Sequence, residues 1–345
     1  MKAVGLSAFG DSANFVDVDA PAPSLRAADV LIRTKAVGFN PIDYQVRSGG
    51  FDNLVAPVVL GFEVSGVVEA IGPGVSQFAV GDRVMAWLGG PSLAGGYAEL
   101  AVAPEDLVVA MPSALTFSQG AAVPLGALTA FRSLRRARAG GGKSLFIAGG
   151  AGGVGSWAIL LSAALGIAHV VTTAGSDQSA QYIMAHLGIP QDSIVRYRGL
   201  PRDALAAEAT RMNGGALFDI ALDCVGDAMT RLCGDAVTFD GVVVSIVNGP
   251  RANPIAGGIA DEDVLFNKSA EFHFELLFAQ TEYAPSRSTA NYARDLQQIA
   301  RLIESGTLRL PRITEVGVLS AETVRQAHRV LESGHTTGKL VATVS

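Results

Sequence analysis

Residues 150–155 carry the pattern best suited to chemistry in this sequence, the string Gly-Ala-Gly-Gly-Val-Gly. Between a buried strand and a helix, such a string brings backbone N–H groups to a pyrophosphate, where the helix dipole favours negative charge. We expect Gly150 to form the sharp turn and Gly155 to let helix and strand pack closely. Gly152 would let the backbone approach the pyrophosphate, with Gly153 and Val154 beside it. The string predicts a nicotinamide dinucleotide site, and a purely structural glycine turn is the alternative.

The segments around this string alternate between apolar strands and helices. A strand over 144–148, a helix over 154–165 and a strand over 168–173 form a unit of the size that dinucleotide-binding βαβ units have. Alternation of this kind predicts a doubly wound parallel sheet, an α/β fold. The expected helices are 118–137, 154–165, 177–187, 203–212 and 227–238, and the expected strands are 144–148, 168–173, 193–197, 217–223 and 241–247.

The two ends of the chain have a different sequence pattern. Up to about residue 120 the sequence has short apolar runs punctuated by Gly and Pro, which is typical of β-rich structure. After residue 250 we expect an apolar run near 271–278, helices over 289–305 and 320–333, and a last strand over 338–344. We predict a first part of an outer domain over 1–122, a dinucleotide-binding domain over 123–262, and a return to the outer domain over 263–345.

The end of the second strand bears on which dinucleotide is bound. NAD-binding units place an acidic residue there, about 20 residues after the glycines, to bind the ribose hydroxyls. This chain has Thr173-Ala174-Gly175-Ser176, and a carboxylate follows only at Asp177. Without the acid a 2′-phosphate is not repelled, and Ser176 can donate a hydrogen bond to it. The sequence therefore favours NADPH over NADH.

Composition excludes several classes of function. The chain has 345 residues, of which 49% are hydrophobic, and its net charge of -6 provides no basic field for nucleic acid. Its two cysteines, Cys224 and Cys233, suit a reducing compartment. The most apolar stretch, 154–174, is interrupted by glycines and His169 and predicts a buried helix and strand rather than a membrane span. No secretory signal opens the chain, so we expect a cytoplasmic protein.

Several motifs together resemble a known family. They are Gly61-Phe62-Glu63-Val64-Ser65-Gly66, Val80-Gly81-Asp82-Arg83-Val84, Gly96-Tyr97-Ala98-Glu99 and Gly334-His335-Thr336-Thr337-Gly338-Lys339. They are similar to the medium-chain dehydrogenase/reductase superfamily, and Asn40-Pro41-Ile42-Asp43 resembles its zinc-free quinone oxidoreductase (zeta-crystallin-like) branch. The resemblance implies a Rossmann domain inserted in a GroES-like, mainly β catalytic domain, with the active cleft between them. It also implies a homodimer.

The resemblance and the residue types both argue against zinc. Zinc-binding members carry His where Phe62 stands and Cys where Asn40 stands. A catalytic zinc needs Cys, His and carboxylate donors that converge on one point, and a phenylalanine has no lone pair to offer. We therefore expect no metal, and hydride transfer without a metal Lewis acid.

The resemblance also implies residues for the substrate. Asn40 resembles a family residue that hydrogen-bonds the substrate oxygen, and a turn residue before Pro41 is the alternative. Tyr44 could supply a phenolic proton or hydrogen bond, or form part of the pocket wall. The apolar side chains expected to shape the pocket and exclude water are Phe51, Phe62, Trp87 and Phe266.

Further residues are expected to contact the cofactor. Thr129 resembles the threonine that holds the nicotinamide carboxamide, and helix packing is its alternative. Asn248, at the end of the fifth strand of the parallel sheet, would line the nicotinamide ring. Tyr197 and Arg198 match the family position that meets the adenosine phosphate, or form an exposed loop. Lys339 is a candidate for a cofactor phosphate.

These features predict an NADPH-dependent, zinc-free oxidoreductase that transfers hydride to small-molecule quinones or α,β-unsaturated carbonyls. Two alternatives remain open. One is a metal-free alcohol or aldehyde reductase, which is disfavoured because an unconjugated carbonyl benefits more from a Lewis acid or a placed proton donor. The other is a non-catalytic NADPH-binding protein with a structural or redox-sensing role.

Overall fold

The computed structural model describes residues 1–49, 54–93, 95–247 and 262–345. The chain divides into two compact units, one made of Met1–Leu128 and Leu277–Ser345, the other of Thr129–Leu276. The first unit is therefore discontinuous, with the second inserted between its two parts. The boundaries after Leu128 and Leu276 lie later than the predicted ones, after residues 122 and 262.

The Thr129–Leu276 unit contains a parallel sheet with the strand order β11-β10-β9-β12-β13-β14. The order reverses between β9 and β12, and sheets of this kind bind ligands beyond the carboxyl ends of the strands at such a point. This arrangement confirms the predicted doubly wound sheet. The strands are β9 (Ser144–Ala148), β10 (His169–Ala174), β11 (Ile194–Arg196), β12 (Phe218–Asp223), β13 (Val237–Ser245) and β14 (Glu271–Phe274).

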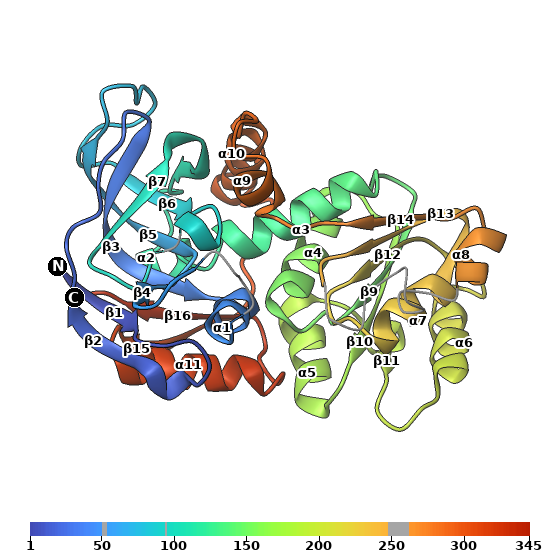
Figure 1. Ribbon diagram of the computed structural model, residues 1–345. Coiled ribbons are helices and arrows are strands. Elements are labelled where there is room, and N and C mark those ends of the chain that lie inside the picture. Colours follow the sequence, from blue (N-terminus) through green and yellow to red (C-terminus); the bar gives the residue numbers. More distant parts are fainter. Residues whose placement is uncertain (50–53, 94, 248–261) are drawn as a thin grey trace. The chain divides into compact units, whose positions relative to one another are not determined.

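Helices cover both faces of this sheet (Figure 1). On one face lie α4 (Gly153–Ala164) and α5 (Asp177–Tyr182), and α5 continues as a π-helical segment over Ile183–Leu187. On the other lie α6 (Arg202–Met212) and α7 (Ala228–Ala236), and α8 (Glu262–Asn267) precedes β14. Phe146, Phe218 and Leu232 belong to the core that forms between sheet and helices.

The single helix predicted over 118–137 is two helices. The first, α2, covers Phe117–Gly120, and the second, α3, covers Pro124–Arg136. Pro124 explains the break, because proline lacks an N–H and disfavours helical backbone in the residue before it. At the first position of α3 the missing N–H costs nothing, since that group has no intrahelical acceptor.

The discontinuous unit is mainly β, as expected. One sheet has the order β15-β16-β3-β5-β6-β8, with β7 pairing with β3, and a second has the order β2-β1-β4. The C-terminal strand β16 pairs antiparallel with β3, so the end of the chain completes a sheet begun near its start. The strands are β1 (Lys2–Leu6), β2 (Phe15–Asp19), β3 (Asp29–Phe39), β4 (Val58–Val59), β5 (Glu63–Ile71), β6 (Arg83–Trp87), β7 (Leu100–Pro104), β8 (Val108–Ala110), β15 (Ile313–Val318) and β16 (Lys339–Thr343).

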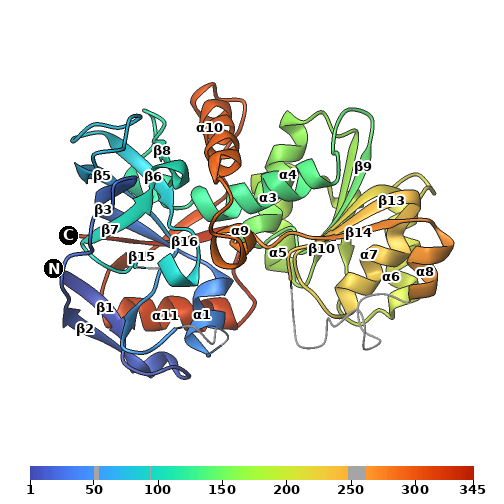
Figure 2. The same cartoon turned by 45° about the horizontal axis from the view of Figure 1, so that its top comes forward.

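Helices α1 (Pro41–Arg47) and α11 (Ala321–Glu332) lie side by side in this unit (Figure 2). Helices α9 (Ala279–Tyr283) and α10 (Ala290–Glu304) follow the return of the chain to the unit. Short 3-10 turns occur at Ser12–Asn14, Pro91–Leu93, Glu105–Leu107 and Gln191–Ser193. Across the residues with described structure, none of the helices has the length and apolar character that crossing a bilayer requires.

Candidate cofactor site and buried polar cluster

The glycine string connects β9 to α4 at the carboxyl edge of the parallel sheet. The left-handed conformation falls on Gly149, with a φ of 88°, and not on Gly150, to which we had assigned the turn. Gly150 is needed for space instead: a Cβ there would lie 2.9 Å from Ile159 Cδ1 and would collide with the Thr172 hydroxyl. A Cβ at Gly155 would lie 2.8 Å from the Gly150 Cα, which agrees with its predicted role in close packing.

Gly152 differs from its neighbours, because space remains beside it. It is the N-cap of α4, and the nearest atom to a Cβ built there is the Gly149 carbonyl oxygen at 3.5 Å. Gly152 has no side chain that could cap the helix. The N–H groups of the first turn of α4, which begins with Gly153 and Val154, have no acceptor within the helix. A diphosphate would supply these acceptors and the negative charge that the helix dipole favours. The glycine turn therefore fits a dinucleotide.

The ends of β10 and β11 bring Ser176 and Tyr197 close together. A Cβ on Gly175 would lie 2.7 Å from the Tyr197 ring carbon that carries the hydroxyl, so the ring covers the residue before Ser176. Ser176 is the N-cap of α5, and its Oγ accepts from the Ser179 N–H at 3.1 Å. Arg198 is exposed. Ser176 thus has a capping role whether or not it also binds a phosphate.

A residue absent from our sequence predictions lies at the same place. Arg196, the last residue of β11, forms an ion pair with Asp177 at 3.0 Å, and both side chains are exposed. The pair links the start of α5 to the end of β11. The signal in the sequence is the run Arg196-Tyr197-Arg198, in which a second arginine precedes the two predicted residues.

The end of β12 carries a buried carboxylate that sequence reasoning also missed. Asp223 Oδ1 accepts from the N–H groups of Val225 and Gly226 at 2.9 and 2.8 Å. Its Oδ2 accepts from the hydroxyls of Thr230 and Ser245 at 2.6 and 2.9 Å. Four donors compensate the burial of this charge and fix the turn after β12, beside Gly149.

The other residues of this unit that were predicted to contact cofactor or substrate differ in their exposure. Thr129 lies on α3 and is buried, and its carbonyl accepts from the Ser133 hydroxyl. Phe266 was expected to line the substrate pocket, but its side chain is 84% exposed on α8, which contradicts that role. Asn248 lies outside the described residues, as does Phe51 of the other unit.

The discontinuous unit contains a buried polar cluster around Asn40. Asn40 Nδ2 donates to Glu63 Oε1 at 2.8 Å, and Lys339 Nζ donates to the same oxygen at 2.5 Å. Lys339 also donates to Asn40 Oδ1. Glu63 Oε2 accepts from the N–H of Leu125 at 2.8 Å. These side chains come from the end of β3, the start of β5 and the start of β16.

This placement corrects the prediction for Lys339. We had expected it to reach a cofactor phosphate, but its side chain is 2% exposed and its ammonium is bonded to Glu63 and Asn40. Phe62 and Trp87 also differ from the expected pocket wall. Both are buried, Phe62 in the core of this unit and Trp87 against the Tyr292 ring at 5.1 Å between centroids.

A second set of buried groups adjoins Asn40. The Tyr97 hydroxyl donates to Asp43 Oδ1 at 2.8 Å and lies 3.2 Å from His328 Nε2, while Asp43 Oδ2 accepts from the Asn40 N–H at 2.6 Å. Burial raises the pKa of Asp43 to about 7 and lowers the pKa of His328 to about 3. Tyr44, on the same helix as Asp43, is half-buried.

The donor set does not fit a zinc ion. In the described ranges no group of three His, Cys, Asp or Glu side chains is placed to hold a metal. Phe62 has no lone pair, and the Glu63 carboxylate is already bonded to the Lys339 ammonium.

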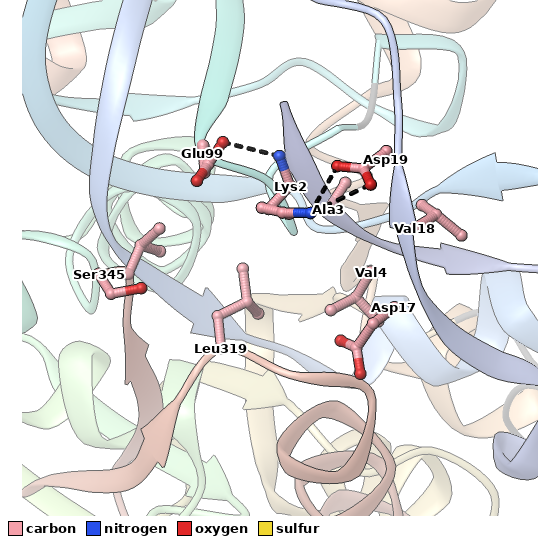
Figure 3. Close-up of a pocket in the computed structure, with 10 residues that line it drawn as sticks. Lys2, Ala3, Val4, Asp17, Val18, Asp19, Glu99, Leu319 and Ser345 are labelled. Carbon is pink, nitrogen blue, oxygen red and sulfur yellow. Dashed lines mark hydrogen bonds and ion pairs between the residues drawn. The ribbon is translucent and has the colours of Figure 1, made fainter.

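A surface hollow of about 330 Å³ lies on the same unit (Figure 3). Its carboxylates are already bonded: Asp19 pairs with the Lys2 ammonium at 2.8 Å, and Glu99 accepts from the Lys2 backbone N–H at 2.7 Å. Asp17 accepts from the N–H of Ala321 at 2.8 Å. These bonds have a structural role, so the hollow is not a candidate site.

Comparisons with known proteins identify the class. Residues 26–113 match the family model of the alcohol dehydrogenase GroES-like domain, and residues 192–341 match the model of zinc-binding dehydrogenases. The chain therefore belongs to the medium-chain dehydrogenase/reductase superfamily, a family of oxidoreductases, as its motifs predicted. Its relatives include quinone oxidoreductases.

Among curated proteins, mouse quinone oxidoreductase is 38% identical over 170 residues, which are 49% of this chain and 50% of the mouse protein. This chain thus matches about half the length of that relative. Tomato 2-methylene-furan-3-one reductase is 29% identical over 92% of this chain and 72% of its own.

Solved structures share the whole fold. A quinone oxidoreductase from Pseudomonas syringae pv. tomato has a TM-score of 0.83 and 28% identity, covering 99% of both chains. A mycobacterial protein complexed with NADPH has a TM-score of 0.84 and 26% identity, also covering 99% of both chains. An alcohol dehydrogenase superfamily protein from Novosphingobium aromaticivorans has a TM-score of 0.82 and 27% identity over the full length of both.

Proposed function

We propose that this protein is an NADPH-dependent, zinc-free reductase of quinones or α,β-unsaturated carbonyls. The observation that carries the proposal is the opening beside Gly152 at the start of α4, at the carboxyl edge of a doubly wound sheet. The names of the relatives, quinone oxidoreductase and an enone-type reductase, support the substrate class. The protein complexed with NADPH supports the cofactor.

The cofactor would be bound by residues of the Thr129–Leu276 unit. The diphosphate would accept hydrogen bonds from the backbone at Gly152, Gly153 and Val154, where Gly150 and Gly155 keep the turn compact. Thr129 and Asn248 are proposed for the nicotinamide end. When bound, NADPH supplies a hydride, and the protein contributes binding and orientation.

Selection of NADPH over NADH would depend on the ends of β10 and β11. Ser176 and Tyr197 lie together there, and the Arg198 guanidinium is proposed as a further phosphate ligand. Asp177, the first carboxylate after β10, is paired with Arg196, which reduces its repulsion of a 2′-phosphate. These contacts support NADPH but leave Ser176 with its capping function.

The substrate oxygen would be bound by Asn40. Hydride addition to the β-carbon of a conjugated carbonyl moves the electron pair onto the carbonyl oxygen, and a hydrogen bond from Asn40 Nδ2 would stabilise the charge there. The resulting enolate then takes a proton at its α-carbon as the carbonyl group re-forms, and the Tyr44 hydroxyl or water is proposed as the source of that proton. No step requires a metal.

The test is an assay of reduced-nicotinamide absorbance with NADPH or NADH and a naphthoquinone, a conjugated enone or a simple aldehyde. The proposal expects oxidation of NADPH by quinone or enone and not by aldehyde. Turnover with the aldehyde alone indicates an alcohol or aldehyde reductase, and tight NADPH binding without turnover indicates a non-catalytic protein. Stoichiometric zinc in a metal assay would contradict the zinc-free proposal.

Cofactor choice has its own test. Ser176→Asp places a carboxylate at the end of β10 and should shift the preference from NADPH towards NADH. Ser176→Thr, which keeps an N-capping hydroxyl, is the control for the capping role. An unchanged preference in the Asp variant would remove Ser176 from the phosphate site.

We also propose that the protein is a cytoplasmic homodimer. Strand β14 is the last in the order of its sheet, and Phe274 on it is 41% exposed, which leaves an edge suited to a second copy. Light scattering would establish the mass in solution, and a monomeric mass would refute the dimer.

A further inference from the structure

The side-chain amide of Asn40 is held at both ends by charged groups. Its Nδ2 donates to Glu63 Oε1 at 2.8 Å, and its Oδ1 accepts from the Lys339 ammonium. Lys339 and Glu63 are themselves 2.5 Å apart, so the three side chains close a triangle. Asn40 is 4% exposed and Glu63 is fully buried, so bulk water does not compete for these bonds.

The charges of the two partners determine which way the amide points. An ammonium only donates hydrogen bonds, and an ionised carboxylate only accepts them. If the amide turned over, Nδ2 would face the Lys339 ammonium and Oδ1 would face the Glu63 carboxylate, and two attractions would become two repulsions. The observed orientation leaves the second N–H of Nδ2 as the remaining donor of Asn40.

Glu63 is fixed as firmly as the amide. Its second oxygen accepts from the Leu125 N–H at 2.8 Å. The backbone of Gly38 lies against the carboxylate, since a Cβ there would be 2.8 Å from Glu63 Cδ. The Leu125 N–H and the Gly38 backbone therefore hold the carboxylate beside Asn40.

Lys339 acts on its surroundings only through these partners. The ammonium has three hydrogens, and three acceptors surround it: Glu63 Oε1, Asn40 Oδ1 and, at 3.4 Å, the Phe39 carbonyl oxygen. No hydrogen remains for a substrate. Of these three acceptors, the Asn40 amide is the one proposed to bind the substrate oxygen.

We propose that Lys339, with Glu63 as its counter-ion, is a positioning residue that fixes and polarises Asn40 for binding a carbonyl oxygen. The inference rests on the proposed function, in which Asn40 binds the substrate oxygen. The ammonium draws electron density from Oδ1 and makes the Nδ2 hydrogens stronger donors. A stronger donor counts most when the oxygen gains negative charge, so Lys339 affects kcat more than KM.

A double-mutant cycle tests this role, with NADPH and a conjugated enone as substrates. Asn40→Ala and Lys339→Met should each lower kcat by about 100-fold, the loss typical for one oxyanion donor. If Lys339 acts through Asn40, the double variant should be no slower than Asn40→Ala alone. If the loss of kcat in the double variant equals the product of the losses in the two single variants, the proposal is overturned. Lys2→Met, at an exposed lysine of the same unit, is the control.

A second variant covers the case in which Lys339→Met does not fold because the Glu63 charge is left buried and unpaired. Glu63→Gln combined with Lys339→Met removes both charges together. Gln at position 63 both donates and accepts, so the amide of Asn40 loses its fixed orientation. The expected result is an unchanged Kd for NADPH with kcat about 100-fold lower, and an undiminished kcat would refute the proposal.

A series of aryl enones with different ring substituents separates positioning from a structural defect. In the variant with both Glu63→Gln and Lys339→Met, the hydrogen-bond donor at the substrate oxygen is weaker. The kcat of this variant should therefore increase more steeply with electron-withdrawing substituents than the kcat of the wild type. Equal slopes would mean that Lys339 and Glu63 only support the fold. A wild type inactive on enones and quinones would refute the proposed function itself, whereas an active wild type with multiplying losses refutes only the role of Lys339.

Discussion

Two glycines of the turn allow a test that separates a role in packing from a role in ligand binding. A Cβ at Gly155 would lie 2.8 Å from the Gly150 Cα and would collide with the Gly149 carbonyl, whereas at Gly152 the nearest atom is 3.5 Å away. Backbone cannot move aside as a flexible side chain can. Gly155→Ala should therefore destabilise the unit by the ~1–3 kcal/mol typical of overpacking, and Gly152→Ala should leave its stability unchanged.

The two variants should have the opposite order in ligand binding. A methyl group at position 152 would stand between the helix start and the diphosphate, so we expect the Kd for NADPH to rise at least tenfold, or about 1.4 kcal/mol. Gly155→Ala should lower the Tm of the Thr129–Leu276 unit by about 2–4 °C for each kcal/mol lost. The result would be one stable variant that binds poorly and one less stable variant.

The chain provides its own fluorescence probe for this experiment. It has two tryptophans, Trp157 on α4 in the Thr129–Leu276 unit and Trp87 on β6 in the other. In a Trp87→Phe background, thermal unfolding followed by fluorescence reports on α4, and titration with NADPH gives Kd. If Gly152→Ala binds NADPH like the wild type, the diphosphate does not lie at this helix start and the cofactor site is wrongly placed.

Four further predictions concern residues whose burial and contacts only the structure shows. Burial raises the pKa of Asp43 from 3.8 to about 7, so the folded state keeps a proton that the unfolded chain loses, and this contribution to stability falls as pH rises from about 4 to 7. Burial lowers the pKa of His328 from 6.5 to about 3, so its contribution rises over about pH 3 to 6.5. Relative to the wild type, the Tm of Asp43→Asn should therefore increase as the pH rises from about 4 to 7. The Tm of His328→Gln should decrease relative to the wild type as the pH rises from about 3 to 6.5. Tm curves that run parallel to that of the wild type would contradict both pKa shifts. Asp223→Asn turns an NH2 group towards hydrogen-bond donors and should lower the free energy of unfolding in urea by about 1–3 kcal/mol, and an unchanged value would mean that the turn after β12 does not depend on it. Arg196→Leu should raise the Kd for NADPH more than that for NADH, because it removes a cation and frees the Asp177 charge; equal changes for both cofactors would place Arg196 outside the phosphate site.

The doubly wound sheet could be predicted because its signals are local. Strands buried on both faces are short apolar runs, and β9 is Ser144–Ala148 as expected. Two errors within this part of the chain have clear causes. The turn lies at Gly149 rather than Gly150, a distinction that depends on φ and that adjacent glycines do not reveal. The break before α3 was present in the sequence as Pro124, and the helical periodicity around it concealed the signal.

The polar cluster could not be predicted, because no local pattern brings its members together. Asn40, Glu63 and Lys339 come from strand ends far apart in the chain, and each is ordinary in its own segment. A lysine near a C-terminus is usually exposed, so a phosphate contact was a reasonable expectation for Lys339. Its burial follows from the pairing of β16 with β3, where Leu340 lies opposite Phe39.

That pairing has a consequence for how the candidate site forms. Asn40 follows β3 directly and Lys339 begins β16, so the register of these two strands sets the contact between their side chains. A slip of one residue would turn the Lys339 side chain to the opposite face of the sheet and leave the Glu63 carboxylate buried without its counter-ion. The cost of that unpaired charge disfavours the wrong register. The same ion pair that orients Asn40 thus also helps to specify how the two ends of the chain join.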